Sequence, residues 1–312
     1  MRIVFMGTPE FAVPTLAALH EAGHTILVIT QPDKKQGRKQ ILTPPPIKAY
    51  ATEHGIEVKQ FERIKSDDGV AAIRDFAPEL MVTAAYGQIL SAEILDIPPK
   101  GCINVHASLL PKLRGAAPIQ QSILDGERTT GVTTMLTDVG LDTGDMLLKC
   151  ETEIMPDETT AELTERLSHM GAELLMETLK ELDKGTLNPT PQDHALATKC
   201  KPITRDMAKL DFTRTAQELH NTVRAMNPWP GAFAYLDDET LKIWRTRPAD
   251  SAKYDTSGIP CGARVPAKTL LINTGDGVLE LLEVQPQNGK RMDGKSFLNG
   301  KSGRKLTDGK LT

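Results

Sequence analysis

The first thirty residues, MRIVFMGTPEFAVPTLAALHEAGHTILVIT, contain the pattern that decides the fold. Arg2–Met6 is a short apolar run that ends at a glycine, as a buried strand does. Phe11–Ala22 carries apolar residues at helical spacing and stops at the next glycine, and His24–Thr30 is rich in β-branched residues. A strand, a helix and a second strand in this order predict a βαβ unit, and therefore a parallel sheet.

The same alternation continues along the first half of the chain. Ile47–His54 predicts a helix, Leu80–Ala85 and Cys102–His106 predict two strands, and Thr159–Leu182 predicts a long amphipathic helix. We therefore expect an α/β fold whose N-terminal domain is Rossmann-like, with a mostly parallel sheet. Ligands bind such sheets at the carboxyl ends of the strands. Three segments have the right place for such a site: Gly7–Phe11, Tyr86–Leu90 and Asn104–Pro111.

A chain of 312 residues is long enough for two domains, because a single core stops growing near ~250–300 residues. We expect a first domain over residues 1–187, a polar linker over 188–205 and a second domain over 206–312. The second domain begins with a helix, Thr215–Met226. Short strand-like pieces between turns then predict an OB-like β-barrel: Leu241–Trp244, Thr269–Asn273 and Val278–Val284. The polar and basic end, Asn299–Thr312, is expected to be partly disordered.

Composition excludes several classes of protein. The four cysteines are far apart and never occur as C-x-x-C, so we expect neither a disulfide framework nor a zinc site, and no metal. No apolar run approaches the ~20 residues of a membrane helix. The N-terminus lacks the long apolar region of a signal peptide. These features favour a cytoplasmic protein that does not enter a membrane, and we expect a monomer.

Charge is distributed unevenly along the chain. Residues 242–312 contain thirteen Lys and Arg but seven Asp and Glu, a balance of +6. Because the whole chain has a formal charge of −4, the first 241 residues carry −10. This asymmetry indicates an acidic front domain and a basic back domain.

Few residues have the pattern of a catalytic site. Asn104 and His106 lie on one face of a predicted strand, because side chains alternate along a strand. Asp142 and Asp145 lie in a glycine-containing loop. A buried, hydrogen-bonded pair and a turn-forming aspartate are the alternatives to a catalytic function. The motif Gly7-Thr8-Pro9 lacks the glycines of a dinucleotide-binding loop, which argues against a nicotinamide cofactor.

The segment INVHASLLPKLRGAAPI, residues 103–119, resembles the signature of the folate-dependent formyltransferases. Asp142, in Val139–Met146, matches the third catalytic residue of that family after Asn104 and His106. The resemblance is narrower to the branch that formylates methionyl-tRNA, and it covers nearly the whole chain. Its further matches are Gly7–Phe11, Gln31–Asp33, Gly37–Arg38, Pro44–Lys48, Asn227–Gly231 and Gly275–Gly277.

Two positions depart from the pattern of that branch. Leu113 stands where the signature usually has an aromatic residue. The basic loop usually reads close to GRGKKL, whereas residues 37–42 read GRKQIL and carry less positive charge.

The resemblance implies transfer of a formyl group from 10-formyltetrahydrofolate to the α-amino group of initiator methionyl-tRNA. Asn104 and His106 would stabilise the developing oxyanion, and Asp142 would accept a proton and orient His106. Folate would be held by Ser108, Leu109, Leu110 and Pro111, with a cis Leu110–Pro111 bond, and by Tyr86, Gly87, Gln88, Ile89 and Leu90. The tRNA would contact Lys34, Lys35, Arg38 and Lys39, and also Lys290, Arg291 and Lys295.

Three other functions share part of these features. A formyltransferase acting on a nucleotide-linked amino sugar would have the same front domain. A glycinamide ribonucleotide transformylase would end near the linker. A non-catalytic RNA-binding protein would not need Asn104, His106 and Asp142 together.

Overall fold

The computed structural model describes residues 1–37 and 39–312, without the side chains of Gln36, Ser302, Thr307 and Asp308. The chain divides into two compact units. Unit 1 comprises Met1–Pro118, Thr129–Glu153 and Thr164–Lys201, and unit 2 comprises Ile119–Arg128, Ile154–Leu163 and Pro202–Thr312.

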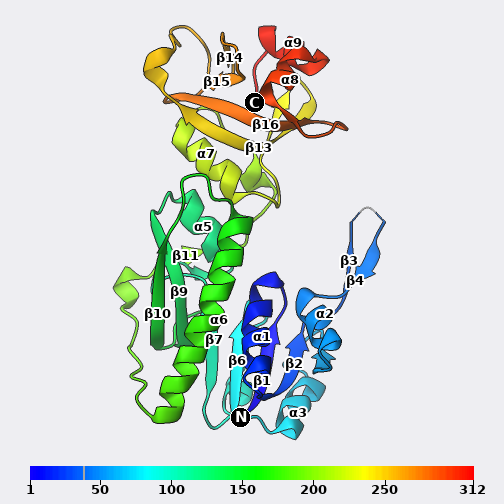
Figure 1. Cartoon of the computed structure of the whole chain (residues 1–312), viewed down its shortest axis with the longest axis vertical. Coiled ribbons are helices and arrows are strands. Elements are labelled where there is room, and N and C mark those ends of the chain that lie inside the picture. Colours follow the sequence, from blue (N-terminus) through cyan, green and yellow to red (C-terminus); the bar gives the residue numbers. More distant parts are fainter. Residues whose placement is uncertain (38) are drawn as a thin grey trace. The chain divides into compact units, whose positions relative to one another are not determined.

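Unit 1 is built on a seven-stranded sheet with the order β10-β9-β7-β6-β1-β2-β5 (Figure 1). Five of these strands run parallel: β1 (Arg2–Gly7), β2 (Thr25–Thr30), β5 (Glu57–Gln60), β6 (Leu80–Ala84) and β7 (Cys102–His106). The strand β9 (Thr129–Leu136) is antiparallel to both β7 and β10 (Met146–Glu153). The expectation of a mostly parallel sheet is confirmed.

Helices cover both faces of this sheet. The period-two pattern of β1 sends Val4 and Met6 to the face that packs with α3 (Asp67–Phe76) and α4 (Ala92–Leu95). On the opposite face, Gly171 of α6 (Thr160–Lys184) lies close enough to Val105 that an added Cβ would be 2.8 Å from its side chain. The remaining helices of unit 1 are α1 (Val13–Glu21) and α2 (Pro46–Glu53).

Unit 2 contains an antiparallel sheet that curls as a half-barrel, in agreement with the expected β-rich second domain. Its order is β12-β13-β16-β15-β14, with β17 paired to β16. The strands are β12 (Phe233–Leu236), β13 (Glu239–Ala249), β14 (Arg264–Val265), β15 (Leu271–Asn273), β16 (Val278–Pro286) and β17 (Met292–Asp293). The helices are α5 (Pro118–Leu124), α7 (Ala216–Ala225), α8 (Gly294–Asn299) and α9 (Lys301–Asp308).

One segment, at the C-terminal end, differs from the sequence-based expectation. Instead of being partly disordered, residues 299–312 contain α9 and end with Leu311 paired to Leu236. The physical reason is burial, since Leu306 and Leu311 are 0% and 2% exposed. Around the basic loop, the strand β3 (Lys34–Gln36) pairs in antiparallel fashion with β4 (Ile41–Thr43).

No helix within residues 1–37 and 39–312 is both long enough and apolar enough to cross a membrane.

Candidate active site

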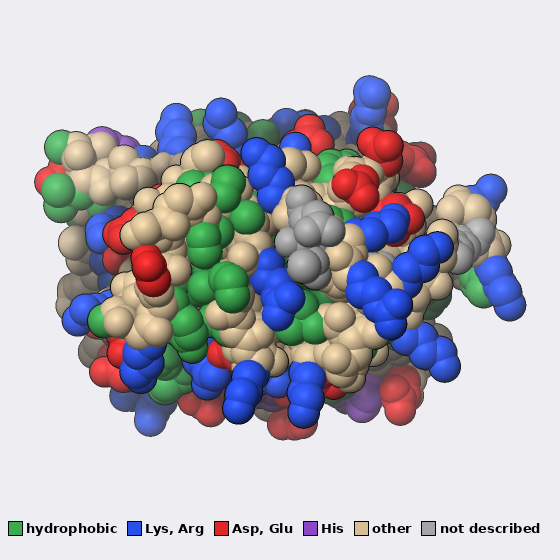
Figure 2. Space-filling view, turned by 90° about the horizontal axis from the view of Figure 1, so that it is seen from above, with side chains coloured by type: hydrophobic (Ala, Val, Ile, Leu, Met, Phe, Trp, Pro, Cys, Tyr) green, Lys and Arg blue, Asp and Glu red, His purple; other side chains and the backbone are tan. Residues whose placement is uncertain are grey.

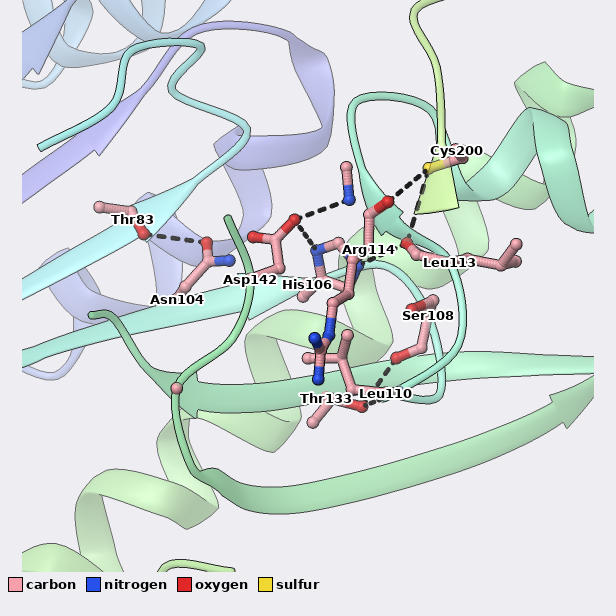
Figure 3. A network of polar contacts seen from close by, with 12 residues as sticks. Thr83, Asn104, His106, Ser108, Leu110, Leu113, Arg114, Thr133, Asp142 and Cys200 are labelled. Atoms are coloured by element: carbon pink, nitrogen blue, oxygen red, sulfur yellow. Dashed lines mark hydrogen bonds and ion pairs between the residues drawn. The ribbon is translucent and has the colours of Figure 1, made fainter. Parts of the chain in front are cut away.

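The strand β7 presents two polar side chains in a largely apolar core. Asn104 lies opposite Thr83 of β6 in the parallel register, and the Thr83 hydroxyl donates to Asn104 Oδ1 at 2.9 Å. Because its oxygen already accepts this bond, the amide nitrogen of Asn104 is the atom available to donate. Figure 3 shows this nitrogen on the side of Asn104 that faces Asp142.

His106 is buried, with 6% of its side chain exposed. Its Nε2 lies 3.0 Å from the carbonyl oxygen of Leu113, and its Nδ1 lies 3.8 Å from Asp142 Oδ2 (Figure 3). A carbonyl oxygen only accepts, so Nε2 carries a hydrogen. Nδ1 then faces the carboxylate, which stabilises any proton that reaches this nitrogen.

Asp142 is held from two directions. Its Oδ2 accepts a hydrogen bond from the backbone nitrogen of Gly115 at 2.8 Å, and its carbonyl oxygen accepts one from Gln192 at 2.9 Å. Its φ of 53° lies in the left-handed region, which aspartate tolerates better than most residues. At Gly144, a Cβ would lie 1.9 Å from the Leu136 carbonyl oxygen, so only glycine fits there. The loop therefore fixes the place of the carboxylate.

The turn after β7 is organised by Thr133 of β9. Its hydroxyl donates to the Ser108 carbonyl oxygen at 2.7 Å and accepts from the Leu110 nitrogen at 3.2 Å. Lys149 Nζ donates to the Leu110 carbonyl oxygen at 2.5 Å, and burial lowers the pKa of this lysine. The Leu110–Pro111 peptide bond is cis. The predicted Ser108–Pro111 segment is thus a fixed turn beside His106.

The segment Tyr86–Leu90 follows β6, and its start is held by two neighbouring strand ends. The Tyr86 carbonyl oxygen accepts from the Thr8 hydroxyl at 3.0 Å and from Gln31 Nε2 at 3.2 Å. The side chains of Tyr86 and Leu90 belong to the core, and burial raises the pKa of Tyr86. Ile89, by contrast, is 60% exposed. Gly87 and Ile89 are thus the exposed positions of this segment.

The predicted tRNA contacts are distant in the sequence from the residues described above. Lys34, Lys35 and Lys39 are exposed on the β3–β4 hairpin, whereas Arg38 lies outside the described residues. In unit 2, Lys290, Arg291 and Lys295 are exposed as well. Lys and Arg side chains recur across the face shown in Figure 2, with apolar side chains between them.

Comparison with known proteins identifies the fold and its two parts. The family model described as formyl transferase matches residues 1–179, and the one described as formyl transferase, C-terminal domain, matches residues 202–302. The chain belongs to the formyl transferase family. Among similar proteins is the methionyl-tRNA formyltransferase of Ruminiclostridium cellulolyticum, 47% identical over 304 residues, with 96% of each chain covered. That of Solibacter usitatus is 46% identical, with 100% of each chain covered.

Solved structures of the formyl transferase fold are more distant in sequence. A crystal structure of WlaRD, described as a sugar 3N-formyl transferase in the presence of dTDP and 5-N-formyl-THF, has a TM-score of 0.65 at 18% identity. It covers 93% of this chain and 99% of that one. HypX from Aquifex aeolicus in complex with tetrahydrofolic acid has a TM-score of 0.61 at 17% identity, and 96% of this chain matches 47% of that one. At these identities the similarity shows the shared fold.

The candidate site also contains residues to which the sequence analysis gave no function. Thr83 and Thr133 hold Asn104 and the turn after β7. Gln192 and Thr198 reach the site from the segment predicted as a linker. Threonines in strands and polar residues in a loop have no distinctive pattern, because their partners are distant in the sequence.

Proposed function

We propose that this formyl transferase moves the formyl group of 10-formyltetrahydrofolate to the α-amino group of initiator methionyl-tRNA. The proposal rests on the presence of Asn104, His106 and Asp142 in one chain that also resembles a named enzyme. The chain is 47% identical, over 96% of its length, to a protein named methionyl-tRNA formyltransferase. The product, N-formylmethionyl-tRNA, would serve translation initiation in the cytoplasm.

Asn104 is proposed to stabilise the transition state. When the amine attacks the formyl carbon, negative charge develops on the formyl oxygen. A fixed amide donor is effective there because it does not need to reorient, and one such donor contributes on the order of 3 kcal/mol. The bond from Thr83 to Asn104 Oδ1 supports this assignment, since it directs the amide nitrogen away from β6.

His106 and Asp142 are proposed to manage the proton that the attacking ammonium loses. Asp142 Oδ2 already accepts from Gly115 and lies 3.8 Å from His106 Nδ1. We assign Asp142 as the proton acceptor, and His106 as the group that shares the proton and faces the developing charge. The bond from Nε2 to the Leu113 carbonyl oxygen supports this by holding the imidazole ring in one orientation.

The residues present fit a folate ligand. A turn fixed by Thr133 and Lys149 lies beside His106. Its Leu109 and Pro111 are only partly buried, so the turn is accessible at these two positions. The segment Tyr86–Leu90 is fixed at its start through the Tyr86 carbonyl oxygen. It carries the exposed side chain of Ile89, which suits a flat pterin ring. The ligand supplies the activated one-carbon unit, and the chain positions it. Among the residues that the structure describes, no three His, Cys, Asp or Glu side chains cluster as metal ligands do.

We further propose that residues 1–187 act as the catalytic domain and residues 206–312 as a tRNA-binding domain. The basic balance of residues 242–312 supports this, because phosphates attract Lys and Arg. Exposed Lys34, Lys35 and Lys39 would add contacts from the β3–β4 hairpin. A single chain then binds both substrates, and we propose that it acts as a monomer.

The test is a formylation assay with 10-formyltetrahydrofolate and two acceptors, methionyl-tRNA and an amino-sugar nucleotide. We expect turnover with methionyl-tRNA alone. Asp142→Asn should lower this turnover by at least ~100-fold while the variant remains folded, since it removes the proton acceptor. Formylation of the sugar nucleotide, or a folded Asp142→Asn variant with normal turnover, would contradict the proposal.

A further inference from the structure

The two family models leave residues 180–201 between them, yet this stretch enters the active site of unit 1. Within it, β11 (Lys199–Cys200) pairs in parallel with β8 (Arg114–Gly115), directly after the signature turn. Thr190 pairs with Met146 at the start of β10. We name residues 190–200 the tether segment. It is joined by backbone hydrogen bonds to the elements that carry the catalytic loops.

Gln192 makes the central contacts of the tether segment. It is 5% exposed, and both ends of its amide are used. Nε2 donates to the carbonyl oxygens of Asp142 at 2.9 Å and Gly144 at 2.7 Å. Oε1 accepts from Arg114 Nε at 2.9 Å and Nη2 at 2.7 Å. One side chain therefore joins the Asp142 loop to the signature segment.

Arg114 is the buried partner that holds the Gln192 side chain in place. It is 4% exposed, and no Asp or Glu among the described residues forms an ion pair with it. Its remaining contact is between Nη1 and His194 Nδ1 at 3.1 Å, again in the tether segment. A buried guanidinium without its acceptors is costly, so Arg114 and Gln192 hold each other in place.

Thr198 contacts the segment that follows β7, at Leu113 and Arg114. Its hydroxyl accepts from the Leu113 nitrogen at 2.9 Å, and its carbonyl oxygen accepts from the Arg114 nitrogen at 2.9 Å. Leu113 is the residue whose carbonyl oxygen receives His106 Nε2. The tether segment therefore supports Asp142 through Gln192 and His106 through Thr198.

We infer that Gln192 and Thr198 are positioning residues for formyl transfer, and that the tether segment is part of the catalytic apparatus. The inference rests on the proposed function of Asp142 and His106. Gln192 acts by holding the backbone of Asp142, so that the carboxylate stays beside His106 Nδ1. Displacement of a catalytic group by about 1 Å can lower a rate by ~100-fold. The bound substrates do not need to touch Gln192 for this effect.

The decisive variant is Gln192→Glu. It keeps an acceptor for Arg114, now as an ion pair, but it loses both donors to the Asp142 loop. We expect kcat to fall about 10- to 100-fold, with KM for each substrate changed less than about threefold. Asn188→Asp is the matched control, because it makes the same chemical change at an exposed tether neighbour whose amide contacts the Thr186 carbonyl. It should behave as wild type.

Combination with Asp142→Asn tests whether Gln192 acts through Asp142. Adding Gln192→Glu to that variant should lower turnover by less than about threefold, because the group that it positions is already gone. Losses that multiply would overturn the inference. If Gln192→Glu does not fold, Thr198→Val, at an exposed position, provides the corresponding fall in kcat through Leu113 and His106. Normal kcat in that folded variant would also overturn it.

Hydrogen exchange gives a readout that does not depend on activity. In Gln192→Glu, amides of the loop from Asp138 to Asp145 should exchange faster than in wild type and in Asn188→Asp. If this occurs in a chain that formylates no acceptor, the proposed function is wrong, but the inference that Gln192 holds the Asp142 loop stands. If exchange and kcat are both unchanged in an active chain, the inference about Gln192 is wrong, but the proposed function stands.

Discussion

Thr83 and Thr15 are both buried, at 7% and 0% exposed, but their hydroxyl groups differ in what they bind. The Thr83 hydroxyl donates to Asn104 Oδ1, whereas the Thr15 hydroxyl has no partner among the described residues. A hydroxyl buried without a partner costs free energy, whereas the Thr83 hydroxyl fixes the amide of Asn104, to which the proposal assigns a catalytic function. The two positions therefore separate a stability effect from a catalytic one.

Thr83→Val should lower turnover about tenfold, because Asn104 loses the bond that directs its amide nitrogen. The substitution keeps the shape of the side chain but leaves Asn104 Oδ1 without its donor, so the free energy of unfolding should fall by about 1 kcal/mol. Thr15→Val, the matched control, should leave turnover unchanged and raise the free energy of unfolding by about 1 kcal/mol. Steady-state kinetics and urea unfolding measure both. Equal turnover in the two variants would show that Thr83 does not orient Asn104.

At the scale of elements, helix α7 begins with a capping box. The Thr215 hydroxyl accepts from the Glu218 nitrogen, and the Glu218 carboxylate accepts from the Thr215 nitrogen at 2.9 Å. These contacts and Arg214 lower the pKa of Glu218 to about 2. The folded chain thus keeps this carboxylate charged where the unfolded chain, with a pKa near 4.5, binds a proton. The stabilisation is complete above about pH 4.5 and is lost as the pH falls through 2.

Glu218→Gln should reveal this pH dependence, since glutamine preserves the capping box but not the charge. At pH 7 the variant should be less stable than the wild type by about 0.5 kcal/mol, a modest value because the Glu218 side chain is 42% exposed and solvent screens its charge. The difference should disappear as the pH approaches 2. Glu21→Gln, at an exposed residue outside the cap, serves as the control in urea unfolding. A difference that stays constant from pH 7 to pH 2 would contradict the charge effect.

Elements with a strong apolar pattern could be predicted from the sequence. Cys102–His106 is β7 as expected, and the predicted helix Thr159–Leu182 matches α6 within two residues. The strand β9 could not be predicted in the same way, since it reads as polar. Its buried Thr133 and Thr134 bind Ser108 and Thr178, which are distant in the sequence. Only the folded chain brings such partners together.

The residues of the candidate site also differ in whether a sequence pattern reveals them. Asn104 and His106 could be identified because they belong to the long signature over residues 103–119. Asp142 could be identified because, in Val139–Met146, it matches the family's third catalytic residue after those two. Gln192 could not, because a lone glutamine in a polar stretch has the pattern of a solvated linker. Its importance arises from the register of β11 on β8, which places it between Arg114 and the Asp142 loop.

At the scale of the whole molecule, the uneven charge is the feature that most constrains the partner. The acidic first 241 residues repel phosphate, so the proposed binding of tRNA would depend on local groups of Lys and Arg. In unit 2, Arg291 lies over the ring of Trp244, 3.7 Å from its centroid, and 3.6 Å from Glu283. Arg291 is therefore held in place, whereas Lys295, exposed on α8, has the character of a simple phosphate contact.

Lys295→Gln should weaken the binding of initiator and elongator methionyl-tRNA alike, because a phosphate contact carries no sequence information. It should also reduce the slope of log K against log salt by about one, since one fewer counterion is released. Lys65→Gln, which makes the same charge change at an exposed residue of unit 1, should leave affinity and slope unchanged. Binding titrations at several salt concentrations measure both quantities. An unchanged slope for Lys295→Gln, or an equal change for Lys65→Gln, would mean that overall charge rather than a local contact on α8 binds the tRNA.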